Sequence, residues 1–290
     1  MKNNLLTIVF SFLVAVSFAE PVRSMLGAAD NISYSDGPDY DPTFPGLVLR
    51  LNIQQEQLTC GITITMGADG LIDWGDGTVE QYIFKNLVQH TYSVAGEYIV
   101  YVDNADGFNA TIKSQILDIL KWKDGITSLS AVTYRNLTNV RYIAGSDTIV
   151  LGDWTFADSF HTDFGDDTMI GPFPMTTNIG FATFGGAYFL KYVLLDGVLT
   201  KMDSTYSFSE LGNRLVPDDE GFKGVIRVGN TCQSLLEVTG FPGGAPTSTK
   251  WICSDGVVAY RNSVWQRIDV TGELFRNMGD GEFVLGPDKK

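Results

Sequence analysis

Short apolar runs separated by turn residues recur from Leu47 onward, and no other feature limits the fold of this chain as much. The first of these runs read LVLRLNI, GITITM, LIDW, EYIVYV and NATIKS. They are rich in β-branched and aromatic residues, and apolar positions alternate with polar ones, as in strands that place one face on a core. No stretch among them keeps a helical period long enough to compete. We therefore predict a small antiparallel all-β domain over residues 46–113.

Beyond residue 113 the apolar runs continue with an approximate repeat. The repeating segments are LDILKWKDGITSLSAVTYRN, LTNVRYIAGSDTIVLGDWTFADS and LKYVLLDGVLTKMDSTYSFSE. Each opens on apolar residues, turns at Gly or Asp into a second apolar run and ends on aromatic residues, with a period of roughly 20–26 residues that is typical of solenoids. Because one such unit cannot bury its apolar edge alone, neighbouring units complete the core. The predicted core layers are Leu137, Val140, Ile143, Phe156, Leu190, Val193 and Phe208.

The segment DWGDGT, which directly follows an apolar strand, brings acidic, aromatic and glycine residues close together. Gly75 and Gly77 can adopt positive φ and turn the chain tightly, and Asp76 can accept hydrogen bonds from backbone amides of its own turn. Trp74 is then a core side chain. Downstream, HTYSVAGEYIVYV alternates as a pair of strands would. We predict a structural role for this motif, whose residues are Asp73, Trp74, Gly75, Asp76, Gly77, His90, Tyr92, Gly96 and Tyr98.

The same region predicts neither a metal site nor catalysis. In VDNADGFNATIK, Val102 and Lys113 occupy the positions where a calcium loop needs its first and last oxygen ligands. An irregular calcium site stays open as an alternative. His90 and His161 are the only histidines, and neither adjoins a Ser or Cys nucleophile motif. A spatial pair of carboxylates for glycoside cleavage is the remaining enzymatic alternative. We therefore predict a protein that is not an enzyme, with no cofactor and no bound metal.

Two family resemblances follow from these motifs. DWGDGT, with HTY at His90–Tyr92 and GEYIV at Gly96–Val100, resembles the polycystic-kidney-disease (PKD) domain family over residues 45–113. That resemblance implies an immunoglobulin-like β-sandwich, usually a spacer or a modest protein or glycan binder, in which Asp73, Asp76 and His90 have turn and core roles. The segments LKWKDGITSLS, LTNVRYI and LGDWTFADS are similar to BspA-like leucine-rich repeats. That second resemblance implies attachment or recognition at a surface, often in bacteria or their phages.

The predicted fold class is mainly β, with an immunoglobulin-like sandwich at residues 46–113 followed by a short, irregular leucine-rich-repeat-like β-solenoid at residues 114–268. The segment WICSDGVVAYRNSVWQRIDVTGEL resembles the closing part of BspA-like proteins, which implies a short capping helix around Tyr260–Arg267. Residues 269–290 are predicted to be a tail. Gly-, Pro- and Asp-containing insertions depart from the repeat, so a compact irregular β domain is the alternative for this half.

The chain begins with features of a secretory signal. A lysine precedes an apolar run from Leu5 to Ala19 that is too short to span a bilayer, and small residues at Ser17 and Ala19 suit cleavage. We predict a signal peptide at residues 1–19 and a flexible acidic linker at residues 20–45, which is rich in Asp, Gly, Pro and Ser. The mature protein is then extracellular or at the cell surface, with no membrane span after signal removal. The virion is the alternative location.

Charge and cysteine content narrow the classes of partner. The formal net charge is −14 and no basic run appears, so nucleic acid is not an expected partner, because phosphate binding relies on clustered Lys and Arg. The three cysteines are Cys60, Cys232 and Cys253, and they lack metal-ligand spacing. Only Cys232 and Cys253 are a candidate disulfide pair, and buried thiols are the alternative.

The irregular segment after Phe160 mixes aromatic residues with Asp and Asn, a combination that sugar-stacking sites use. The candidate ligand-binding residues are Phe164, Phe173, Phe181, Phe184 and Tyr188, although burial in the core is the competing explanation for such rings. The function predicted is a secreted or cell-surface interaction protein for adhesion to, or recognition of, a host or neighbouring-cell surface protein or glycan. A receptor-binding or structural virion protein of a phage and, less favoured, a carbohydrate-active enzyme are the alternatives. An oligomer is compatible with this function.

Overall fold

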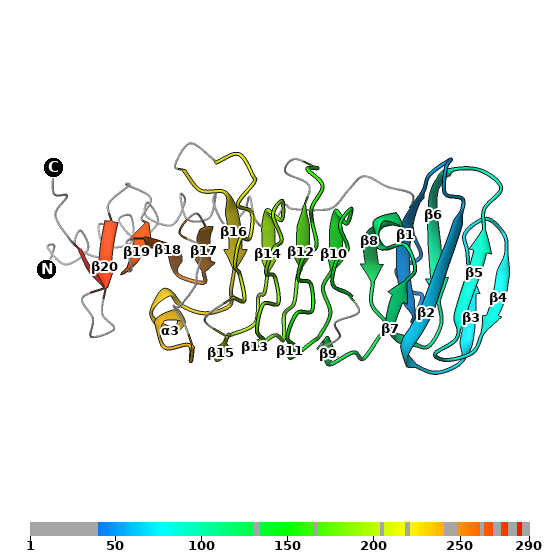
Figure 1. The fold of residues 1–290 in the computed structure, drawn as a ribbon. Helices are drawn as coiled ribbons and strands as arrows, with labels where there is room; N and C mark the ends of the chain where they lie inside the picture. Colours follow the sequence, from blue (N-terminus) through cyan, green and yellow to red (C-terminus); the bar gives the residue numbers. More distant parts are fainter. Residues whose placement is uncertain are drawn as a thin grey trace, which may run out of the picture.

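The computed structural model describes residues 40–129, 134–164, 168–203, 206–217, 221–240, 247, 249–261, 264–268, 274–277 and 283–285. This part of the chain is mainly β, with almost no helix, and it contains a β-solenoid of about five turns (Figure 1). The prediction of a mainly β chain with a solenoid is confirmed. The helical pieces include the 3-10 helix η1 (Lys113–Gln115) and the five-residue helix α3 (Cys232–Leu236).

Residues 47–110 form seven antiparallel strands, which we call the N-terminal lobe. One sheet has the order β1-β6-β3-β4 and the other has the order β5-β2-β7, and both contribute to the same hydrophobic core. The strands are β1 (Leu47–Ile53), β2 (Thr59–Gly67), β3 (Gly70–Asp73), β4 (Val79–Tyr82), β5 (Leu87–Thr91), β6 (Gly96–Val102) and β7 (Ala105–Ala110).

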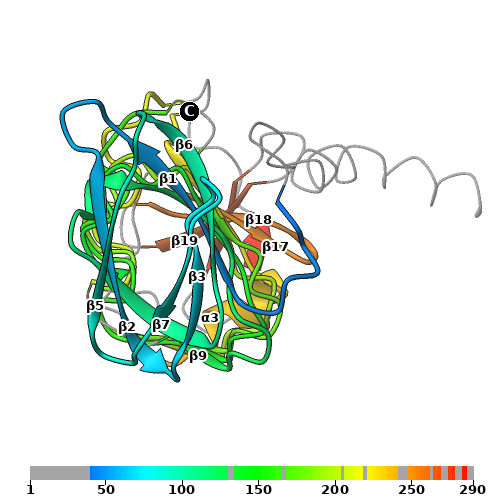
Figure 2. The same ribbon diagram turned by 90° about the vertical axis from the view of Figure 1, so that its right-hand side faces the viewer.

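The solenoid adds two parallel series of short strands. The long series contains β8 (Ile116–Lys121), β10 (Tyr142–Ala144), β12 (Met169–Gly171), β14 (Tyr192–Leu194), β16 (Gly224–Arg227) and β17 (Thr249–Cys253). The short series contains β9 (Ser128–Leu129), β11 (Val150–Leu151), β13 (Asn178–Ile179) and β15 (Lys201–Met202). Each coil passes from the long series to the short series and returns through a turn-rich segment. Figure 2 looks along the solenoid axis, with the N-terminal lobe toward the viewer.

Strand β8 joins the lobe to the solenoid within one sheet. It pairs antiparallel with β1 on one side and parallel with β10 on the other. The result is a continuous sheet of 14 strands that runs from β4 of the lobe to β21 near the C-terminus (Figure 1). The hydrophobic core is continuous as well, because Tyr134 of the first coil packs on Phe108 of β7 and its hydroxyl donates to the Asp106 carbonyl oxygen (3.1 Å). The two predicted domains therefore share a sheet and a core.

The solenoid core is built from matching side chains of successive coils. In the long sheet, an inward row passes through neighbouring register partners, and every member is buried: Ile119, Ile143, Ile170, Val193, Ile226 and Trp251. Opposite that sheet, the rings of Tyr134, Phe156, Phe184 and Phe208 stack one on the next, with centroids 5.1–6.2 Å apart. All seven predicted core layers are buried, so this part of the prediction is confirmed.

The predicted capping helix around Tyr260–Arg267 is wrong. That segment forms the antiparallel strands β18 (Gly256–Arg261) and β19 (Val264–Ile268), in which Tyr260 is the register partner of Trp265. Valine, isoleucine and aromatic residues hold six of the thirteen positions from Gly256 to Ile268, and their stiff or bulky side chains favour a pleated sheet over a helix. In the predicted tail, β20 (Leu274–Asn277) and β21 (Phe283–Leu285) extend the sheet further.

The end of the predicted linker contacts the sheet. The Asp41 amide donates to the Tyr101 hydroxyl (2.9 Å), the Phe44 ring meets the Tyr101 ring edge-on, and Lys121 Nζ donates to the Pro42 carbonyl oxygen (3.2 Å). The predicted signal peptide and residues 20–39 lie outside the described residues. No helix within the described ranges is long and apolar enough to cross a membrane.

Candidate functional site

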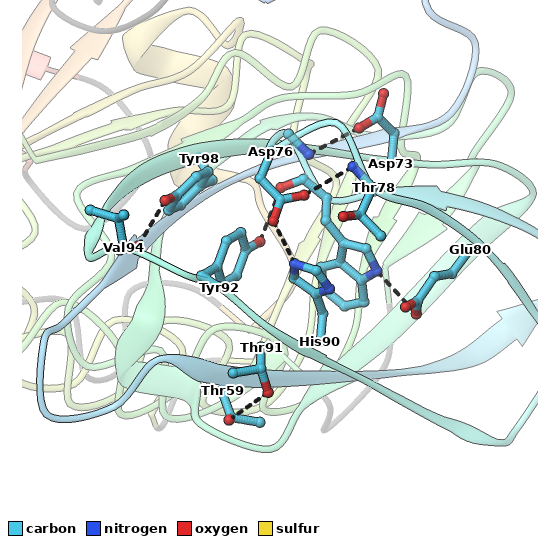
Figure 3. A network of polar contacts seen from close by, with 12 residues as sticks. Thr59, Asp73, Asp76, Thr78, Glu80, His90, Thr91, Tyr92, Val94 and Tyr98 are labelled. Atoms are coloured by element: carbon cyan, nitrogen blue, oxygen red, sulfur yellow. Dashed lines mark hydrogen bonds and ion pairs between the residues drawn. The ribbon is translucent and has the colours of Figure 1, made fainter.

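The DWGDGT motif and His90 form one connected network on the N-terminal lobe (Figure 3). His90 Nε2 and Asp76 Oδ2 are 2.8 Å apart, and the His90 ring stacks on Trp74 with centroids 5.1 Å apart. Trp74 Nε1 donates to Glu80 (3.3 Å), and the Tyr92 hydroxyl donates to the Trp74 carbonyl oxygen (3.1 Å). The Thr78 amide donates to Asp76, which closes the turn. Every polar contact is thus directed at the lobe itself.

The electrostatics of this network favour a scaffold. Burial alone would raise the pKa of Asp76, but hydrogen bonds from His90 and Thr78 outweigh it and lower the pKa. A carboxylate that is held ionised and already bonded to an imidazole is a poor general acid. Gly75 and Gly77 both have positive φ, and a Cβ on Gly75 would lie 2.3 Å from the Ile99 carbonyl oxygen. This geometry agrees with the structural role predicted for the motif.

Trp74→Ala is expected to lower the free energy of unfolding by about 3–5 kcal/mol, because the ring is fully buried and its removal leaves a cavity. Urea denaturation of the variant measures this loss. His90→Ala is the companion variant and should leave any binding activity intact at a temperature where it stays folded. A Trp74→Ala variant with an unchanged midpoint would show that the ring is not a core side chain.

The structure separates the five aromatic candidates into two groups. Phe173 and Phe184 are fully buried and belong to the continuous core, so their prediction as ligand-binding residues is wrong. They are the inward rings of their coils, where burial of a large apolar surface contributes most. Phe164, Phe181 and Tyr188 keep part of their surface exposed. Phe181 and Tyr188 lie on the turn-rich segments that connect the two strand series.

One row of rings follows these turns from coil to coil. Trp154 contacts Phe181 with centroids 5.1 Å apart, and Phe181 contacts Tyr206 at 5.2 Å, both in edge-to-face geometry. Tyr206 is 49% exposed, and the other two rings are half-buried. Arg135 of the preceding coil places its guanidinium 4.5 Å from the Trp154 ring centroid. We call these four residues, Arg135, Trp154, Phe181 and Tyr206, the aromatic row.

Charged and aromatic groups lie beside the aromatic row on the same turns. Asp158 accepts hydrogen bonds from Arg135 Nε (2.9 Å) and Nη2 (2.6 Å). The Tyr188 ring lies against the His161 ring in a tilted geometry, with centroids 4.9 Å apart, and its centroid is 4.4 Å from the Arg214 guanidinium. A hydrogen bond to the Glu210 carboxylate raises the pKa of Tyr188. The turns thus present rings, arginines and carboxylates together, a set of groups that can recognise a polar ligand without reacting with it.

The same backbone geometry recurs from coil to coil and holds these turns in place. Two residues after each stacked core ring, the backbone has positive φ, at Asn136, Asp158, Gly186 and Glu210. One position before three of those rings, a hydroxyl donates to a carbonyl oxygen of the same or the preceding coil, from Thr155, Thr183 and Ser207. Trp154 itself has a φ of +58°, which is uncommon for a bulky residue. The side chains of the row therefore project from a fixed backbone.

The described part of the chain contains neither a disulfide nor a cluster of metal-binding side chains. It contains no group of three or more His, Cys, Asp or Glu residues arranged to hold a metal ion. Cys60, Cys232 and Cys253 are buried, and the candidate disulfide between Cys232 and Cys253 is not formed. Burial raises the pKa of Cys60 to about 12, which keeps this thiol protonated and unreactive. His161 donates to the Gly186 carbonyl oxygen (3.1 Å), a backbone partner that activates no nucleophile.

A buried ion pair marks the seam between lobe and solenoid. Arg50 of β1 and Asp118 of β8 are register partners, 2.9 Å apart, and Arg141 before β10 reaches the same carboxylate (3.2 Å). Burial raises the pKa of Asp118 to about 7, despite the opposing effect of Arg50. This site links the three elements that meet at β8, and both Arg50 and Asp118 are inaccessible to a ligand.

The stability contributed by Asp118 should fall as pH rises from about 4 to about 7. Its folded pKa lies above the unfolded value of 3.8, so in this window the folded state binds a proton that the unfolded state has lost. Relative to Asp118→Asn, the wild type should therefore lose at least about 1 kcal/mol of unfolding free energy across the window. Urea titrations of both proteins at about pH 4 and about pH 7 measure this loss. A wild type that gains stability relative to the variant as pH rises would contradict the raised pKa.

Comparisons with known proteins give no relative for this chain: no family model, no curated protein and no solved structure matches it. The site is therefore defined by its own geometry. Sequence reasoning missed Arg135, Trp154 and Tyr206 of the aromatic row. The available signal was the recurring pattern of a hydroxyl residue before a core phenylalanine, seen in WTF, ATF and YSF. The surface ring is the first residue of WTF and YSF and the residue just before ATF.

Proposed function

We propose that this protein is a secreted or cell-surface interaction protein that binds a surface protein or glycan through the turn side of its solenoid and has no enzymatic activity. The observation that carries this proposal is the aromatic row, three rings and an arginine in contact across four successive coils. Accessible aromatic and arginine side chains on a rigid backbone are the groups that dominate binding energy at recognition surfaces.

The finer fold description belongs to the same proposal. We assign the N-terminal lobe to an immunoglobulin-like sandwich of the PKD type and the solenoid to BspA-like leucine-rich repeats. The antiparallel pairing within both sheets of the lobe and the buried Trp74 support the first assignment. Parallel short strands with matching core residues in each coil support the second. In this arrangement the lobe closes the first coil of the solenoid.

The proposal is tested by exposing the purified protein to a glycan array and to extracts of host or neighbouring-cell surfaces. Retention of a defined glycan or a defined surface protein is expected, and it should weaken when Tyr206 is replaced by alanine. Mass analysis of the mature N-terminus tests secretion separately, because processing after Ala19 is expected and an intact Met1 would argue for the virion alternative. Release of reducing ends from a polysaccharide, abolished by one carboxylate substitution, would overturn the non-enzymatic assignment.

A further inference from the structure

We propose that the aromatic row binds an uncharged polysaccharide chain that lies along the solenoid axis and crosses successive coils. This inference rests on the proposed function and names its ligand class. The rings come one from each of three consecutive coils, and their centroids are 5.1 and 5.2 Å apart. A ligand that matches this spacing must itself be a linear repeat, because each coil offers one similar contact and the coils advance along one axis.

The chemistry of the row fits sugar rings. A pyranose presents apolar C–H groups on its faces and hydroxyls on its rim, so it can stack on an aromatic ring while its rim meets polar groups. The row supplies both partners: half-buried or exposed ring surface at Trp154, Phe181 and Tyr206, and fixed polar groups beside it. Asp153 is one of these polar groups. Its carboxylate accepts a hydrogen bond from the Phe181 amide (2.8 Å), and the residue is exposed next to the row.

The charges around the row select against ionised chains. Four carboxylates lie on these turns, at Asp153, Asp158, Asp203 and Glu210. Two arginines oppose them: Arg135, whose charge is balanced by Asp158, and Arg214. The chain as a whole carries a formal charge of −14. An anionic polysaccharide or a nucleic acid would meet net repulsion, although nucleobases also stack on aromatic rings. An uncharged glycan avoids this repulsion.

The row is also organised before any ligand arrives. Arg135 is fixed by two hydrogen bonds to Asp158 and by its contact with Trp154. Trp154 is held by a backbone bond from its amide to the Phe181 carbonyl oxygen (2.8 Å) and by a left-handed φ. Each ring also packs edge-to-face on the ring of the next coil. Binding therefore requires little ordering of side chains, which raises the affinity that a shallow surface can reach.

Affinity gel electrophoresis with soluble xylan, mannan and mixed-linkage β-glucan tests the proposal, with polygalacturonate and alginate as anionic comparators. At least one uncharged polysaccharide should retard the full-length protein, and the anionic ones should not. Phe181→Ala and Tyr206→Ala should each weaken the interaction about tenfold, the typical effect of removing one stacked ring. Tyr192→Ala is the matched control, because Tyr192 is a half-buried ring on strand β14, in the coil of Tyr206, and lies outside the row.

Chain length gives a second readout. Affinity for oligosaccharides of the retarding polysaccharide, measured by calorimetry, should rise with length until the chain spans three coils and then level off. Retardation by none of the uncharged polysaccharides, preference for the anionic ones, or binding that survives both substitutions would overturn the inference. If instead a defined surface protein binds and the same two substitutions abolish that binding, the proposed function stands and the glycan assignment fails.

Discussion

Phe184→Ala is expected to lower the free energy of unfolding by about 3–5 kcal/mol, whereas Phe181→Ala, three positions earlier in the same turn, should cost less than about 1 kcal/mol. Phe184 has no exposed surface and stacks between Phe156 and Phe208, at 5.9 and 5.1 Å. Its removal interrupts the ring stack in the middle of the solenoid and leaves a cavity that the neighbouring coils cannot fill without moving their backbones. Phe181 loses only contacts at the surface with Trp154 and Tyr206.

The two variants make a sharp test because each removes one phenylalanine side chain from the same turn of the same coil. Urea denaturation gives the two stabilities, and polysaccharide binding gives the second readout. The expected result is a crossed pattern: Phe184→Ala loses stability and, where it stays folded, keeps its affinity, while Phe181→Ala keeps stability and loses affinity. Equal stability losses would place Phe181 in the core and remove it from the binding surface.

The same pair shows why the sequence predicted the core better than the site. Burial follows from the repeat, so Leu137, Ile143 and Val193 could be assigned from their position in each unit. On the turns, no fixed period relates inward to outward residues, because residues such as Asp158 and Glu210 adopt positive φ and reorient the chain. Phe181 and Phe184 were both predicted as ligand-binding residues, although only Phe184 follows the hydroxyl residue that precedes the core phenylalanines.

The C-terminal error has a different physical origin. The helix expected around Tyr260–Arg267 came from the resemblance to the closing segment of another family, and the alternating valines and aromatic residues of VVAYRNSVWQRI pointed to strands. In the structure those residues continue the long sheet as an antiparallel meander from β17 to β21. A sheet edge that has already formed favours adding another strand, since each strand satisfies the backbone groups of the one before it.

The relation between the two predicted domains lies beyond what local pattern can show. Residues 46–113 were expected to form a sandwich of their own, and the strand pattern supports strands there. What the pattern does not contain is the second pairing partner of β1, which is β8, a strand that belongs to the first coil of the solenoid. The Arg50–Asp118 pair is equally invisible in the sequence, because the two residues lie far apart along the chain and meet only through that pairing.

Deleting residues 1–112 is therefore expected to abolish folding of the solenoid, and the fragment 113–290 should show no cooperative unfolding transition. Without β1, the strand β8 becomes an open edge and Asp118 loses its partner Arg50. Without β7, the Tyr134 ring at the start of the core stack loses Phe108 and becomes exposed to water. Solenoids need a closing unit at each end because an uncovered terminal coil leaves its apolar layer exposed.

Near-ultraviolet circular dichroism and urea titration of the fragment measure this effect directly. Hydrogen exchange on the full chain supplies the complement: amides of β6 and β12 should exchange with similar opening free energies, because the shared sheet makes lobe and solenoid unfold together. A fragment that unfolds cooperatively, or a lobe whose amides open independently of the coils, would restore the two-domain picture of a separate spacer. A fragment without a cooperative unfolding transition would instead mean that the lobe is the cap on which the binding surface of the solenoid depends.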